Sequence, residues 1–345
     1  MESVPDDYAM KRARLRHKYI QAASHLLQVL SSEAKDAYQS DELTKLGVSL
    51  GSFDPNYQDF LDTKACFFKP LSPDALKEYS LDLEGRTLSY YLKFDEMYDR
   101  PTSAESPSSS DVLEKRADQI FRHLDLLYTN YYKKSGRDVK FFDEVAGWDE
   151  IKHDNPFFDS GRGLLIDFRR RGAPGYETSA RREWQGEDND IETICAHVML
   201  VICSGAKAKD DELLFSELGP IAQVIQNRLS QKEFENTSFF PVLAVSLFGP
   251  RHGRLLQAKF DQSSILKVQI SPIYSFRYRA DAPFKLFLRY YGCEPRAGPE
   301  SELYSDEDTP TQAAETAIKS PFPYVDKISS AEPDRRRKEY CIVNI

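Results

Sequence analysis

The clearest pattern in the chain lies between residues 163 and 260, where short apolar runs surround one longer amphipathic stretch. The runs are rich in branched and aromatic residues and are bounded by polar or turn-forming residues, as is typical of β-strands. They cover residues 163–170, 196–207, 239–248 and 253–260. Residues 211–230 have the spacing of a helix. The pattern therefore predicts strand, strand, helix, strand, strand, with a hairpin turn at 249–253 and a further strand at 265–270.

Two other regions show helical spacing. Residues 7–47 are expected to be helical, and they carry the cations Lys11, Arg12, Arg14, Arg16 and Lys18. This basic run is either a solvated helix face or a patch for phosphate binding or nuclear import. Residues 113–131 repeat apolar side chains at intervals of three and four, and Asp111 is the expected N-cap.

The remaining composition divides the chain into four parts. Residues 1–100 form a helical and mixed N-terminal region, and residues 101–110 are a linker of small polar residues. Residues 111–295 form the α/β core, in which the polar segment 172–190 is expected to be a long surface loop that holds at most one more strand. Residues 296–345 are expected to be a largely disordered tail.

Charge and composition narrow the classes of protein. The 345 residues carry a formal net charge of −9, and 41% of them are hydrophobic, which is enough for a sizeable core. The acidic balance argues against binding of nucleic acid through bulk charge, although local basic patches remain available. No apolar run reaches the ~20 residues of a membrane span, and no secretory signal is evident. The five cysteines form no CxxC pair, which favours a reduced intracellular compartment, cytoplasmic or nuclear.

The candidate chemistry lies on the first two predicted strands. Asp167 stands inside the first strand, in Leu165-Ile-Asp167-Phe, and Lys207 ends the second, in Cys203-Ser-Gly205-Ala-Lys207. Glu217-Leu-Gly219 opens the following helix. These residues and their order resemble the PD-(D/E)XK nuclease-like superfamily, above all its degenerate members in fungal proteins. The resemblance implies an α/β (α+β) fold with a restriction-endonuclease-like core: a helical N-terminal region and a small mixed sheet flanked by helices.

The resemblance also implies a metal-dependent phosphodiesterase. An Asp and a second carboxylate would hold Mg²⁺ or Mn²⁺, and the Lys would assist the attacking water. Asp167 and Lys207 take these places, but Gly205 stands where the second acid is expected. Glu217 or Glu212 is the candidate replacement, Glu217 as a catalytic residue and Glu212 as a metal ligand.

Five arginines are candidate contacts to the phosphates of a nucleic acid. They are Arg169, Arg170, Arg171, Arg181 and Arg182. The alternative is a solvated sheet edge that is protected from aggregation by charge.

Each candidate also has a purely structural interpretation. Asp167 would then pair with a neighbouring arginine, Lys207 would only end a strand, and Glu217 would be an exposed helix residue. His197 is expected in the core and His252 at the surface of a hairpin turn. Nucleophile-elbow, Walker, zinc-protease and dinucleotide motifs are absent from the sequence.

Two functions follow from these alternatives. The first is a nuclease-like domain with a degenerate site that binds or cleaves nucleic acid with Mg²⁺ or Mn²⁺. The second is a non-enzymatic module that keeps the fold and binds a protein partner. Neither interpretation involves a membrane.

Overall fold

The computed structural model describes the chain in stretches that include the predicted core. They are residues 5–32, 35–63, 65–99, 109–135, 137–151, 175–185 and 195–296. All of them belong to one compact structural unit, Met1–Leu303. The predicted strand 163–170, with Asp167 and Arg169 to Arg171, lies outside the described residues, as do residues 101–108 of the linker and residues 297–345 of the tail.

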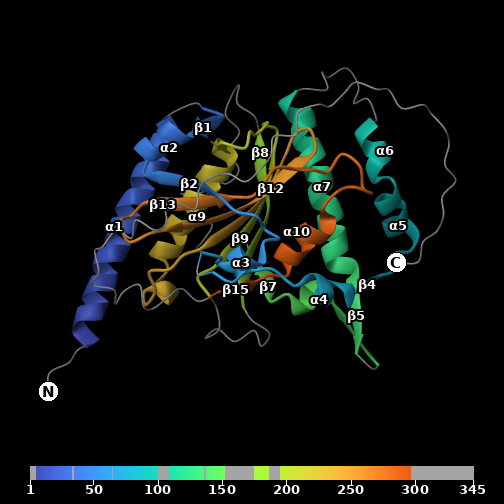
Figure 1. Cartoon of the computed structure of the whole chain (residues 1–345), viewed down its shortest axis with the longest axis horizontal. Coiled ribbons are helices and arrows are strands. Elements are labelled where there is room, and N and C mark those ends of the chain that lie inside the picture. Colours follow the sequence, from blue (N-terminus) through green and yellow to red (C-terminus); the bar gives the residue numbers. More distant parts are fainter. Residues whose placement is uncertain are drawn as a thin grey trace. The chain divides into compact units, whose positions relative to one another are not determined.

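A mixed sheet of eight strands occupies the centre of the described part of the chain (Figure 1). Its order is β2-β13-β12-β11-β9-β8-β7, and β14 pairs with β12. The strands are β2 (Val48–Ser52), β7 (Trp148–Glu150), β8 (Tyr176–Trp184), β9 (Val198–Ser204), β11 (Val242–Phe248), β12 (His252–Phe260), β13 (Leu266–Ile270) and β14 (Tyr274–Ser275). The pairs β9–β11 and β2–β13 are parallel, and the other pairs are antiparallel. The expected mixed sheet flanked by helices is therefore present, and it is larger than predicted.

Helices cover both faces of this sheet (Figure 1). On one face, α1 (Pro5–Ser32) and α9 (Phe215–Ser230) share an apolar core with alternate residues of the central strands. On the other face, α7 (Ser110–Asn130) and α10 (Phe284–Tyr291) pack with the intervening residues. Successive side chains of a strand point to opposite faces, and both faces here are covered. This explains why β9 and β11 are apolar at nearly every position rather than at every second one.

The other elements are short and lie around the sheet. The helices are α2 (Ser40–Lys45), α3 (Gln58–Leu61), α4 (Pro73–Lys77), α5 (Gly85–Leu92), α6 (Phe94–Asp99), α8 (Phe142–Val145) and the 3-10 turn η3 (Lys232–Phe234). The strands are β1 (Ala37–Gln39), β3 (Phe68–Lys69), β4 (Ser80–Leu81), β5 (Tyr131–Ser135), β6 (Asp138–Phe141), β10 (Glu212–Leu214) and β15 (Glu294–Pro295). They form three small sheets, β1-β10, β3-β15 and β4-β5-β6.

The predicted strands at 196–207, 239–248, 253–260 and 265–270 are confirmed as β9, β11, β12 and β13, with the hairpin turn between β11 and β12. The predicted helix at 211–230 begins later, at Phe215, because residues 212–214 pair with β1 as strand β10.

Two predictions near helix ends are wrong. The first helix ends at Ser32 rather than continuing to residue 47, and the chain after it supplies β1, α2 and β2. Its last turn is capped by hydroxyl donors: Ser31 Oγ bonds the Leu27 carbonyl and Ser32 Oγ bonds the Val29 carbonyl. The N-cap of α7 is Ser109 rather than Asp111, since the Ser109 hydroxyl accepts from the Val112 N–H.

Candidate functional site

The predicted site lies where β9 and β11 end side by side. Because the two strands are parallel and Ser204 is opposite Phe248, their carboxyl ends adjoin at one edge of the sheet. Gly205 and Lys207 follow β9 directly, and the Lys207 side chain is exposed. Lys207 is thus available to a ligand. Its predicted metal-binding partner, Asp167, lies outside the described residues.

The first turn of α7 fills the space beside Gly205. A Cβ atom at position 205 would lie 2.3 Å from both the carbonyl oxygen and the hydroxyl oxygen of Ser110. A Cβ atom at Gly249, which follows β11, would lie 2.5 Å from the Cβ of Leu113. Close-packed atoms leave no such room. The position where the resemblance requires an acidic side chain therefore cannot hold one without displacing α7.

Backbone hydrogen bonds fix this contact. The Gly175 N–H donates to Ser110 Oγ at 3.0 Å, and the Gly205 N–H donates to the Gly175 carbonyl at 2.8 Å. The Gly249 N–H donates to the Ala206 carbonyl at 3.1 Å. The start of β8, the ends of β9 and β11 and the first turn of α7 are thus joined into one closely packed corner.

Glu217, the first candidate for the missing acid, is fully buried and paired. Its Oε1 accepts from Arg254 Nε at 2.8 Å and its Oε2 from Arg254 Nη2 at 2.5 Å. Oε2 also accepts from the Leu214 N–H at 2.9 Å. Both side chains are 0% exposed. The interpretation of Glu217 as an exposed helix residue is therefore wrong, and its carboxylate is occupied by protein donors.

Glu212, the second candidate, is also engaged. Its Oε2 accepts from Gln39 Nε2 at 2.7 Å, and its Oε1 accepts from the Lys209 N–H at 3.0 Å. Arg254 holds the same loop, since its guanidinium donates to the carbonyls of Lys209 and Glu212 at 3.0 and 2.9 Å. Buried charges are stable only with such partners. The two acids therefore tie α9, β12 and the loop 209–212 together.

Among the predicted phosphate contacts, Arg182 points into the protein. Its side chain is 8% exposed, its Nη2 lies 3.3 Å from Asp125 Oδ1, and its guanidinium stacks on the rings of Tyr128 and Tyr291 at 4.3 and 5.0 Å. Burial raises the pKa of Asp125, and Arg182 opposes that rise. Arg182 is thus not placed to line an exposed phosphate groove. Arg181, its neighbour on β8, is half-buried.

These residues do not fit the divalent cation that the resemblance implies. A hard cation needs several free oxygen ligands. Gly205 supplies none, and the carboxylates of Glu212 and Glu217 bind protein donors. Across the described stretches, no group of three or more His, Cys, Asp or Glu side chains is arranged to hold a metal ion.

Two buried histidines are structural. His197 is 3% exposed, as predicted for a core residue, and lies between the rings of Phe68 and Phe239. His123, which the sequence analysis did not single out, is 0% exposed and packs on Phe94 and Phe284. Burial lowers the pKa of each to about 3, so both are neutral at pH 7.

Four buried arginines were not predicted from the sequence: Arg228, Arg251, Arg254 and Arg289. Arg228 Nη2 lies 2.8 Å from Glu183 Oε2, and Arg251 Nη2 donates to the Phe94 carbonyl at 2.8 Å. Arg228 and Arg254 each lie in an apolar predicted helix or strand. That position was an available signal, since a charge in a buried element requires a partner. The turn around Arg251, between Pro250 and His252, gave no such signal.

Scans against protein-family models, curated proteins and solved structures found no match to this chain. None of the helices in the described part of the chain has the length and apolar character needed to cross a membrane.

Proposed function

We propose that this protein is a non-cleaving module of nuclease-like architecture, which acts by binding a partner. One observation carries the proposal: the first turn of α7 occupies the space beside Gly205, where a metal-binding acid would have to stand. Hydrolysis of a phosphodiester with a divalent cation needs a second carboxylate at that point. The two candidate substitutes, Glu212 and Glu217, bind protein donors instead.

The pairing of Glu217 with Arg254 supports the same conclusion. A carboxylate that accepts three hydrogen bonds in a fully buried position must lose them before it binds a metal ion. Breaking such a pair leaves an uncompensated buried charge, which is strongly destabilising. Glu217 is therefore better explained as part of the fold than as part of a reaction.

The direct test is a cleavage assay with the purified chain. Labelled single- and double-stranded DNA and RNA are incubated with Mn²⁺, Mg²⁺ or EDTA, beside the variants Lys207→Ala and Gly205→Glu. We expect intact substrate in every reaction, including Gly205→Glu, because α7 blocks the restored acid. Metal-dependent cleavage that Lys207→Ala abolishes would overturn the proposal.

A metal-dependent nuclease is the second candidate, and the exposure of Lys207 at the end of β9 favours it. In that case Asp167 and Lys207 act together, and the second acid comes from residues outside the described ranges. The assay above distinguishes the two functions if Asp167→Asn is added. Equal loss of cleavage in Asp167→Asn and Lys207→Ala would establish the nuclease.

A further inference from the structure

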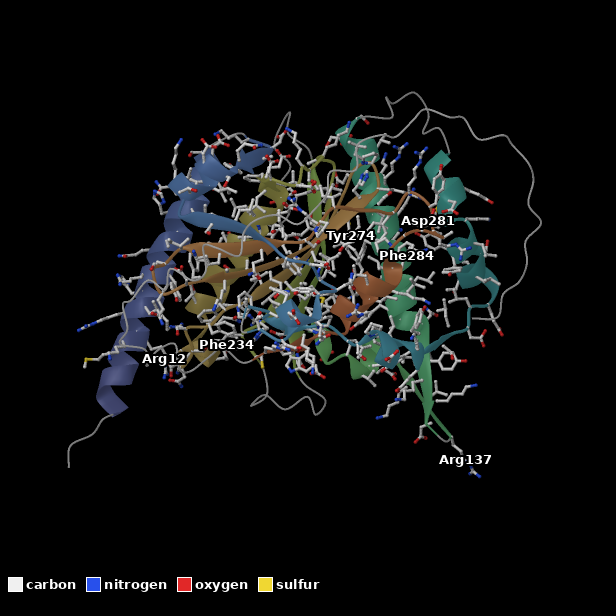
Figure 2. The ribbon with its side chains drawn as sticks, in the orientation of Figure 1. Arg12, Arg137, Phe234, Tyr274, Asp281 and Phe284 are labelled. Carbon is white, nitrogen blue, oxygen red and sulfur yellow. The ribbon has the colours of Figure 1, made fainter. Side chains whose placement is uncertain are left out.

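The hairpin formed by β5 and β6 extends away from the main sheet. Figure 2 shows Arg137 at its tip, directed outward from the rest of the described residues. In the small sheet β4-β5-β6, β5 is paired on both sides and β6 is the edge strand. All four residues of β6 are exposed, among them Val139 at 48% and Phe141 at 40%. We call residues 131–141 the basic hairpin.

The charge of the basic hairpin opposes that of the whole chain. It contains four cations and one acid, a local balance of 4 − 1 = +3, in a protein of net charge −9. The cations are Lys133, Lys134, Arg137 and Lys140. Lys133 and Lys140 are directly opposite each other in the strand register, which is unfavourable for like charges. Glu78 pairs with Lys133, but among the described residues Lys140 has no ion-pair partner.

One face of the basic hairpin combines aromatic rings with a cation. Tyr132 is opposite Phe141, and their ring centroids are 6.4 Å apart. On the same face, Lys134 is opposite Val139 and its Nζ lies 5.5 Å from the centroid of the Tyr132 ring. Proteins that bind single-stranded nucleic acids combine these two elements: cations that follow the phosphates and aromatic rings on which bases stack.

The base of the hairpin is held by the core. Phe142, which follows β6, is 2% exposed and makes edge contacts with Tyr79 and Tyr128 at 4.9 and 5.7 Å. The hairpin is therefore anchored at one end and free at the other, and the half-buried Tyr132 ring and the exposed Phe141 ring are already positioned. Pre-positioned groups lose less entropy when they bind.

We propose that the basic hairpin binds single-stranded nucleic acid through Lys134, the rings of Tyr132 and Phe141 on the same face, and Arg137 at the tip. The ligand chemistry is a flexible polyanion with flat bases, which DNA and RNA share. An acidic peptide would match the cations but would leave the two rings unused. This inference names single-stranded nucleic acid as the partner of the proposed binding module. It rests on the proposed function for one point: the bound strand is not cleaved.

The test is fluorescence anisotropy of the full chain with labelled dT and rU 20-mers in EDTA, at low and moderate salt. We expect the double variant Lys134→Glu/Arg137→Glu to bind at least ~10-fold more weakly, since it removes two phosphate contacts and adds two repulsive charges. Phe141→Ala should weaken binding by roughly 5-fold or more through lost stacking. Comparing the affinity for rU with the affinity for dT shows whether RNA or DNA is the preferred polyanion.

A matched control variant reverses two charges at another place on the protein surface. Arg14→Glu/Lys18→Glu alters two exposed cations of α1 and changes the net charge by the same amount. We expect its affinity to stay within ~3-fold of the wild type. Thermal melting of each variant verifies that it is folded.

Several results would overturn the inference. They are the absence of binding, equal loss in the α1 control, stronger binding of duplex than of single strands, or displacement of the oligonucleotide by polyglutamate at equal charge. Adding Mn²⁺ separates this inference from the proposed function. Hairpin-dependent binding in EDTA, together with cleavage in Mn²⁺, would keep this inference and reject the proposed non-cleaving module. The absence of both cleavage and binding would keep the non-cleaving module and reject this inference.

Discussion

The corner at Gly205 and the basic hairpin both carry residue types that nucleic-acid enzymes use, but they differ in whether their charges are matched. Near that corner, where α9 meets β12, Glu217 and Arg254 are 0% exposed and satisfy each other. In the hairpin, Lys134 and Arg137 are exposed, and neither has an ion-pair partner among the described residues. The comparison teaches that a charged residue in a promising motif indicates a binding site only where the fold leaves it accessible and unmatched.

The energetic consequences of the two arrangements are opposite. Removing one member of a buried pair leaves the other charge desolvated, which costs several kcal/mol of folding stability. Changing an exposed charge alters stability little, because water screens it, but it alters the attraction of a charged ligand. Mutations at the corner should therefore act on folding, and mutations in the hairpin should act on binding.

The largest expected effect is that of Glu217→Ala, which leaves Arg254 buried without its carboxylate. We expect the free energy of unfolding to fall by about 3–5 kcal/mol, as measured by urea denaturation. Glu177→Ala, at an exposed position on β8, is the control and should change stability by less than about 0.5 kcal/mol. A loss below about 1 kcal/mol for Glu217→Ala would mean that the pair is not buried as described.

Acid titration probes the two buried histidines, His123 and His197. The pKa of His123 and of His197 is about 3 in the folded protein, against 6.5 for an ordinary histidine. The unfolded chain therefore binds more protons as the pH falls below 6.5, and stability is lost toward pH 3. Between pH 6.5 and 5 this amounts to roughly 2 kcal/mol for each histidine.

The variant His123→Phe tests this assignment. Phe fits the aromatic surroundings of Phe94 and Phe284 and does not titrate, so the dependence of stability on pH should become about half as steep. Urea denaturation at several pH values measures the slope. An unchanged slope would show that His123 does not cause the loss.

Gly205→Ala should be destabilising by about 1–3 kcal/mol, because its new Cβ meets Ser110 in a closely packed corner. Gly51→Ala is the matched control: Gly51 also lies in the central sheet, but its nearest atom would be Gln269 Cγ at 4.0 Å. We expect that substitution to be neutral or slightly stabilising. Equal melting temperatures for the two variants would contradict the contact between α7 and Gly205.

The smallest effect is expected for Lys140→Thr. It removes the like-charge pair with Lys133 and should stabilise the protein by about 0.2–1 kcal/mol in low salt. Lys134→Thr is the control, because Lys134 lies opposite the uncharged Val139. If both variants melt alike, the opposed lysines carry no measurable repulsion.

Much of the sheet could be predicted from the sequence, because β9, β11, β12 and β13 are continuous apolar or alternating runs. Strand β8 could not be placed, since Arg181, Arg182 and Glu183 gave its segment the composition of a loop. Two of these charges are buried against partners far away in the chain, Asp125 and Arg228. Sequence spacing does not reveal such pairings.

The contacts around the candidate residues could not be predicted from the sequence. Lys207 follows the end of β9, beside the end of β11, as the apolar run suggested. The state of Glu217 depends on Arg254, which stands on a different element 37 residues away. The occupation of the space beside Gly205 likewise depends on α7, which enters that corner from an earlier part of the chain.

The measurement that tests the central claim most directly is calorimetric titration of the full chain with Mn²⁺. If the corner at Gly205 is closed and Glu212 and Glu217 are engaged by protein donors, no saturable binding should be observed, and the melting temperature should be the same in Mn²⁺ and in EDTA. Saturable binding at one site, lost in Asp167→Asn and unaffected by the hairpin variants, would contradict the account and restore the metal-dependent nuclease.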